Sequence, residues 1–79
     1  MRLRSYENAK VLFDTFAGEC FDNDGHLVII VQIVDGGCVC EDVDGEEKFY
    51  NFHELSVDDK VFQKILAVKN RESVSWGNN

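Results

Sequence analysis

Three thiols and two imidazoles are the side chains of this sequence best suited to metal binding or nucleophilic chemistry. They belong to Cys20, Cys38, Cys40, His26 and His53. Cysteine and histidine form tetrahedral zinc sites, but Cys38 and Cys40 would lie about 7 Å apart on one face of a strand. The histidine spacings do not match a zinc finger. Because free cysteine is among the most buried residue types, we predict core thiols and no metal, with a small zinc-binding domain as an alternative.

The pattern C-x-D-x-D-G occurs twice, beginning at Cys20 and at Cys40. Its D-x-D-G part is similar to the start of an EF-hand calcium loop, which requires a bidentate Glu at its twelfth position. That position is Val31 in the first copy and Asn51 in the second, so neither copy supplies the ligand. Asp-Gly is a strong signal for a hairpin turn. The two copies therefore predict two hairpin tips with similar turn chemistry.

The sequence carries no recognisable catalytic motif. Nucleophilic catalysis requires Cys or Ser beside a His that a third group orients, and no glycine-rich phosphate loop, nucleophile elbow or HExxH string accompanies the residues above. A chain of 79 residues also leaves little room for a substrate pocket. We expect no enzymatic activity and no cofactor.

Charge is distributed very unevenly along the chain. The sequence has 8 Lys and Arg residues against 15 Asp and Glu residues, which gives a net charge of −7. Residues 11–47 contain no Lys or Arg and carry ten of the acids. Such a negative surface disfavours nucleic acid and anionic lipid as direct partners. It favours a partner protein with a basic surface.

We expect the base-free segment, residues 11–47, to form an acidic partner-binding surface. Carboxylates along a hairpin can imitate a phosphate backbone and fill a groove built for DNA or RNA, and their charge steers the encounter. Acidic turns can also serve solubility alone and block edge-to-edge pairing of strands. The residues expected to contact the partner are Glu41, Asp42, Asp44, Glu46, Glu47, Asp22, Asp24 and Asp35.

Apolar residues at spacings of three and four predict two amphipathic helices. The first covers residues 5–17, with Tyr6, Ala9, Phe13 and Phe16 on its apolar side. Ser5 is suited to cap its start and Gly18 to end it. The second begins at Ser56-Val57-Asp58-Asp59, where the serine can cap, and ends near Asn70. Residues 72–79 form either an edge strand through Val74 and Trp76 or a frayed tail.

Between the helices, β-branched and aromatic runs separated by Asp-Gly turns predict an antiparallel meander. The expected strands cover residues 27–34, 38–43 and 48–52, with a short extra strand near 19–21. No linker interrupts the chain. The predicted fold class is α+β, a single small domain over residues 1–79 in α-β-β-β-α order, with a three- to four-stranded meander packed by two helices.

The strand over residues 27–34 is apolar on both faces. Strict alternation places Leu27, Ile29, Val31 and Ile33 on one face and Val28, Ile30 and Val34 on the other. A strand with one wet face would alternate apolar and polar residues, so both faces need cover. The cover is either a strongly curled sheet or a chain end, a second copy or a partner. A second copy would make the protein an assembly module that forms a homodimer through Val28 and Ile30.

The N-terminal residues lack the apolar core of a signal peptide. The longest apolar run, Leu27 to Val31, is far shorter than the roughly 20 residues that span a bilayer. Three cysteines do not suggest a disulfide framework, so we expect a cytoplasmic protein without membrane contact. In size, charge and architecture the chain is similar to small acidic phage and mobile-element proteins, including anti-CRISPR inhibitors, antitoxins and immunity proteins. This likeness is compositional, and it implies an inhibitor whose partner handles nucleic acid.

Overall fold

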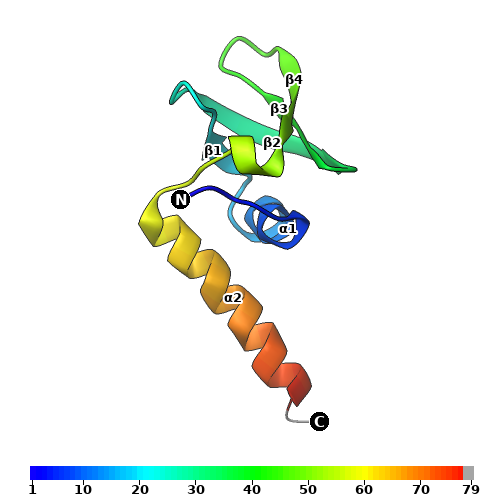
Figure 1. The fold of residues 1–79 in the computed structure, drawn as a ribbon, viewed down its shortest axis with the longest axis vertical. Helices are drawn as coiled ribbons and strands as arrows, with labels where there is room; N and C mark the ends of the chain where they lie inside the picture. Colours follow the sequence, from blue (N-terminus) through cyan, green and yellow to red (C-terminus); the bar gives the residue numbers. More distant parts are fainter. Residues whose placement is uncertain (78–79) are drawn as a thin grey trace.

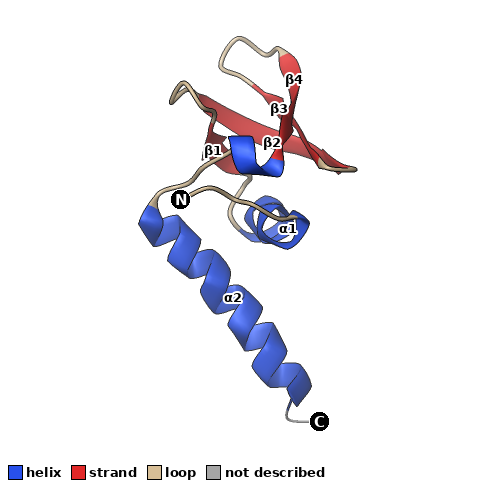
Figure 2. Ribbon diagram, viewed as in Figure 1, coloured by secondary structure: helices blue, strands red, loops and turns tan. Residues whose placement is uncertain are grey.

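The computed structural model describes residues 1–77 and contains one antiparallel sheet with a helix before it and a helix after it (Figure 1). The elements are α1 (Tyr6–Thr15), β1 (Glu19–Phe21), β2 (Leu27–Val34), β3 (Gly37–Glu41), β4 (Glu47–Asn51), the 3-10 helix η1 (Phe52–Glu54) and α2 (Asp59–Gly77). Figure 2 shows the strands grouped at one end, with α2 extending away from them. The predicted α+β class is confirmed, and so is the extra strand at residues 19–21.

The four strands form a meander in the spatial order β1-β2-β3-β4. Each strand pairs antiparallel with the next one along the chain. In such a sheet, alternate connections lie at the same end. The loop between β1 and β2 and the loop between β3 and β4 therefore share one end of the sheet, and the turn at Asp35-Gly36 lies at the other (Figure 1).

The core lies between the sheet and the two helices. The buried side chains are Leu3, Ala9, Leu12, Cys20, Val28, Ile30, Cys38, Cys40, Leu55, Val57, Phe62 and Ile65. All three cysteines are free and buried, as the sequence predicted. Burying such side chains stabilises the fold by about 1.5–3 kcal/mol for each large one.

Helix α1 begins where the sequence predicted, but it ends at Thr15, two residues before the predicted end, and its buried side is only partly the predicted one. The Ser5 side chain accepts a hydrogen bond from the backbone N–H of Asn8, and Gly18, at φ 72°, follows the helix. The buried positions are Asn8, Ala9 and Leu12, whereas Tyr6 and Phe13 are exposed. Asn8 is buried on the side of the helix where an aromatic side chain was expected. Burial of this polar side chain is tolerated because its amide donates a hydrogen bond to the carbonyl of Leu3.

Helix α2 begins at Asp59, two residues later than a helix capped by Ser56 would begin. Ser56 does not cap it, because its backbone pairs with that of Phe21 at 2.8 and 2.9 Å and extends the sheet beyond β1. The helix continues through Gly77, so residues 72–77 form neither an edge strand nor a frayed tail. The segment around Ser56 already covers the β1 edge, and no Pro interrupts the helix. Residues 78 and 79 of the predicted tail lie outside the described residues.

Strand β2 contains a β-bulge at Val31. Ile30 lies opposite Cys40 and Gln32 lies opposite Val39, so Val31 has no partner on β3. One extra residue moves every later side chain to the other face. The strict alternation expected along residues 27–34 is therefore wrong beyond Ile30.

Within residues 1–77, the part of the chain that the structure describes, no helix combines the length and the apolar character that crossing a bilayer requires.

Candidate functional site

The two Asp-Gly loops have the same internal structure. In the first, Oδ1 of Asp22 accepts hydrogen bonds from the backbone N–H groups of Asp24 and His26, both at 2.9 Å. In the second, Oδ1 of Asp42 accepts from Asp44 at 2.9 Å and from Glu46 at 3.0 Å. The first Asp of each loop thus ties the turn together, as Asx turns do. The similar turn chemistry predicted from the repeated pattern is confirmed.

The strands beneath the loops also repeat. Cys20 lies opposite Val28 on the first hairpin, and Cys40 lies opposite Lys48 on the second. Both members of each pair are displaced by the same twenty residues, so β1–β2 and β3–β4 are two copies of one hairpin register. Because β2 pairs with β3, the two copies lie beside each other with their loops at the same end (Figure 1).

A hollow of about 520 Å³ lies between the two loops. We call it the inter-loop hollow, and its lining includes the acids Asp22, Asp42, Asp44 and Glu46, together with Leu27, Lys48 and Tyr50. The carboxylate of Asp24 lies within 4.8 Å of ligand atoms of Asp22 and His26. We refer to Asp22, Asp24, Asp42, Asp44 and Glu46 as the acidic end. Five of the eight acids predicted from the sequence are thus brought together.

The other three predicted acids do not line the inter-loop hollow. Glu41 and Glu47 are directly opposite each other on β3 and β4, close to the acidic end. Like charges in this position repel, so these strand ends are held by backbone hydrogen bonds and not by their side chains. Asp35 lies in the β2–β3 turn, at the far end of the sheet. It does not belong to the same surface.

Arg2 anchors the first loop, and backbone hydrogen bonds within the loop lower the pKa of Asp22. Arg2 donates through Nη1 to Oδ1 of Asn23 and to the carbonyl of His53, both at 2.7 Å, which links the loop to η1. The backbone N–H groups of His26 and Asp24 hold the pKa of Asp22 below its ordinary value, against the opposing effect of partial burial. Asp22 is therefore ionised at neutral pH, with one oxygen committed to the loop.

The residues predicted for self-association do not lie on a surface. Val28 and Ile30 are 1% and 2% exposed, because they face the helices from the centre of the sheet. The prediction of a dimer interface at these residues is therefore wrong. The exposed side of β2 carries Leu27, Ile29 and Val31, and Phe49 of β4 is also exposed. We call these four residues the outer apolar face. The sequence showed two apolar faces but gave no sign of which one meets the helices.

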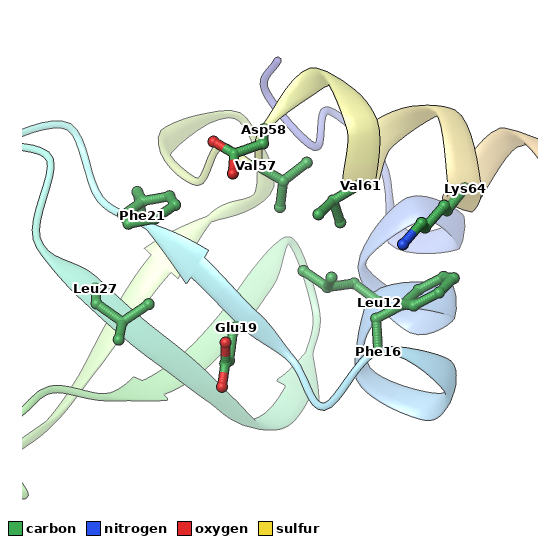
Figure 3. Close-up of a pocket in the computed structure, with 9 residues that line it drawn as sticks. All are labelled: Leu12, Phe16, Glu19, Phe21, Leu27, Val57, Asp58, Val61 and Lys64. Atoms are coloured by element: carbon green, nitrogen blue, oxygen red, sulfur yellow. The ribbon is translucent and has the colours of Figure 1, made fainter.

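A second hollow, which the sequence did not predict, lies where the sheet meets the helices. It has a volume of about 280 Å³, and Figure 3 shows side chains from α1, β1, β2 and the start of α2 around it. We call it the helix groove. Its lining residues are Leu12, Phe16, Glu19, Phe21, Leu27, Val57, Asp58, Val61 and Lys64. They come from four separate segments of the chain, so no local pattern could have revealed the groove.

The three thiols do not gather with either histidine. Within residues 1–77, the group of side chains placed closely enough to share a metal ion is Asp22, Asp24 and His26. Burial raises the pKa of Cys38 to about 12, and a hydrogen bond with Cys40 together with burial raises the pKa of Cys20. Both thiols are therefore protonated and unreactive at neutral pH.

Comparison with known proteins finds no matching family model, curated protein or solved structure. What the arrangement can do chemically therefore follows from its own geometry. The acidic end concentrates negative charge around a hollow, and the helix groove offers apolar walls beside it. These are properties of a binding surface for cationic and apolar groups.

Proposed function

We propose that this protein is a small, non-enzymatic binding domain that engages the basic surface of a partner protein through the acidic end. The observation that carries the proposal is the pair of matching hairpins, which places Asp22, Asp42, Asp44 and Glu46 around one hollow. Solubility alone would be served by acids scattered over the surface. Here a repeated register brings them to one end of the sheet.

The type of partner follows from the charge. A concentrated negative surface raises the association rate with a basic protein and fixes its orientation. Basic protein surfaces of this extent are typical of proteins that handle nucleic acid. We therefore infer an inhibitory or regulatory role in which the acidic end occupies a nucleic-acid-binding groove, in the manner of phage and mobile-element inhibitors or immunity proteins.

The test uses charge reversals that spare the loop structure. Asp22 and Asp42 hold the turns through their carboxylates, so they are left unchanged. The acidic-end variant carries Asp24→Lys, Asp44→Lys and Glu46→Lys. A control with the same change of charge carries Asp14→Lys, Asp35→Lys and Asp59→Lys. Asp14 and Asp59 form exposed ion pairs, with Lys10 and with the N-terminal amine, and exposed pairs of this kind contribute little to stability.

Both variants and the wild type are used as bait in nuclease-treated lysate of the native host, and the captured partner is then purified. The proposal predicts one stoichiometric basic protein that binds the wild type and the control but loses at least about tenfold in affinity for the acidic-end variant. Binding must also weaken as salt is raised. Equal affinity for all three proteins, or indifference to salt, would contradict the proposal.

Self-association is a second candidate, and the outer apolar face favours it. Leu27, Ile29, Val31 and Phe49 are each more than a third exposed, and exposed apolar groups on one sheet face often mark an interface. This candidate predicts a dimer in sedimentation equilibrium that Ile29→Lys converts to a monomer. A monomeric wild type at millimolar concentration would end it.

A further inference from the structure

The helix groove and the acidic end are parts of one continuous surface. Leu27, the first residue of β2, lines both the helix groove and the inter-loop hollow. Its side chain is about two-fifths exposed. A segment of chain lying across Leu27 would therefore have one hollow on each side of it.

The helix groove is built for one large apolar side chain. Leu12 and Val57 form buried walls, and Phe16, Phe21 and Val61 are partly exposed around it. In Figure 3 the side chains of Leu12, Val57 and Val61 converge from the two helices and the segment before α2. A volume of about 280 Å³ is at the lower limit of ligand pockets. It accommodates an aromatic ring but not a folded element.

Charge at the edge of the groove identifies the kind of occupant. Glu19 and Asp58 are exposed acids among the nine lining residues, and Lys64 is the one base among them. A second copy of this chain, with its net charge of −7, would bring carboxylates against these acids and the acidic end. An aromatic side chain flanked by Lys or Arg complements both hollows instead.

We propose that the helix groove binds an aromatic anchor side chain of the partner, while basic residues at a fixed distance along the same partner segment contact the acidic end. This inference rests on the proposed function and adds the chemistry of the partner to it. An aromatic side chain in a desolvated pocket typically supplies most of the lasting affinity of an interface. The charges supply orientation and speed of association.

The test uses a panel of short fluorescein-labelled peptides that all have the same composition. Each contains the same number of Lys and Arg residues and one Trp, and the Trp moves one position at a time along the peptide. Because the two hollows are a fixed distance apart, the inference predicts a preferred Trp position that binds at least about tenfold more tightly than the others in fluorescence anisotropy. Binding that depends on charge alone shows no preferred position.

A pair of variants places the anchor in the groove. Leu27→Gln changes an exposed side chain at the junction of the hollows, and Phe13→Gln changes an equally exposed apolar side chain that lines neither hollow. Leu27→Gln should remove the preference for one Trp position while charge-dependent binding persists. Phe13→Gln should leave the preference unchanged. NMR shifts on binding should include Phe16 and Val61.

The outcomes separate this inference from the proposed function. If every Trp position binds equally, and the acidic-end variant binds none of the peptides, the proposed function stands and the anchor inference is wrong. If no peptide binds the wild type at low salt although the captured partner protein does, the anchor inference is overturned and the proposed function stands. If Leu27→Gln instead dissociates a wild-type dimer measured by sedimentation, the occupant is a second copy, and the inference is likewise overturned.

Discussion

Asp22 and Asp42 show how single residues serve both structure and surface. Each uses one carboxylate oxygen to accept two backbone hydrogen bonds within its own loop. The carboxylates of their exposed neighbours, Asp24, Asp44 and Glu46, do not hold the loops together. The sequence predicted all five as partner-binding acids, but it could not separate the two that hold the loops from the three that are free to contact a partner.

The substitution Asp22→Asn tests whether the Asp22 carboxylate stabilises the first loop. Backbone hydrogen bonds from His26 and Asp24 lower the pKa of Asp22 in the folded state, so its ionisation stabilises the fold above the unfolded pKa of about 4. That contribution is lost as the pH falls through the lowered folded value. We expect Asp22→Asn to cost about 1 kcal/mol at pH 7. The difference from wild type in urea unfolding should shrink toward pH ~2.

The control for this prediction is Asp35→Asn, which removes a carboxylate outside the two loops. It should leave the pH profile of stability nearly unchanged. A loss for Asp22→Asn that is constant between pH ~5 and pH ~2 would show that the asparagine acts by another route.

The cysteines offer a second test at the residue scale. All three are buried, and burial raises the pKa of Cys38 to about 12. Because burial keeps the reagent away from all three sulfurs, we expect no reaction with an aromatic disulfide reagent in the native protein at pH ~8, and reaction of all three thiols in urea. Rapid labelling of the native protein would contradict the packing described for the sheet.

At the scale of elements, the sequence predicted the strands correctly from local patterns, but it did not predict which residues pack or pair across long distances in the chain. The Asp-Gly turns and β-branched runs predicted all four strands, because hairpin pairing is decided over a few residues. The buried side of β2 depends on where the helices pack, and Ser56 joins the sheet instead of capping α2 because of its pairing with Phe21. Neither choice is encoded in a local pattern. The helix groove was missed for the same reason.

Two neighbouring residues on β2 test which side is the core. Ile30 is 2% exposed, and Ile29 is 41% exposed. We expect Ile30→Ala to lower the free energy of unfolding by about 2–5 kcal/mol because it leaves a cavity, and Ile29→Ala to lower it by less than about 1 kcal/mol. Urea unfolding of both variants provides the comparison. Equal losses would mean that the outer face of β2 is covered as well.

At the scale of the whole molecule, charge and shape are both asymmetric. The described fold has principal extents of 45 × 24 × 18 Å, with α2 extending from the body as seen in Figure 1. The acidic end lies at the loops of the two hairpins. Composition predicted the sign of this surface, but its compactness comes from a meander that returns the second loop to the same end as the first.

Crowded carboxylates make stability sensitive to salt. Raising NaCl from ~10 mM to ~500 mM shortens the Debye length from about 30 Å to a few ångströms and screens their repulsion. We expect the wild type to become more stable over this range. The neutral variant Asp24→Asn, Asp44→Asn, Glu46→Gln should start more stable and gain less. Parallel salt dependence of the two proteins in thermal unfolding would contradict this expectation.

Because of the bulge at Val31, the curvature of the sheet can be changed in this protein without changing which residues of β2 and β3 are paired. Val31 has no partner on β3, and both Ile30 with Cys40 and Gln32 with Val39 are paired on either side of it. Deleting Val31 would restore perfect alternation from residue 27 to residue 34 without changing one pairing. A deletion in the middle of a strand normally destabilises the fold strongly, because it moves every later side chain of the strand to the opposite face of the sheet. Here we expect a folded protein with the same core, a flatter sheet, and a different angle between the two acidic loops. Amide NMR spectra would show that the core is retained, and residual dipolar couplings would measure the angle.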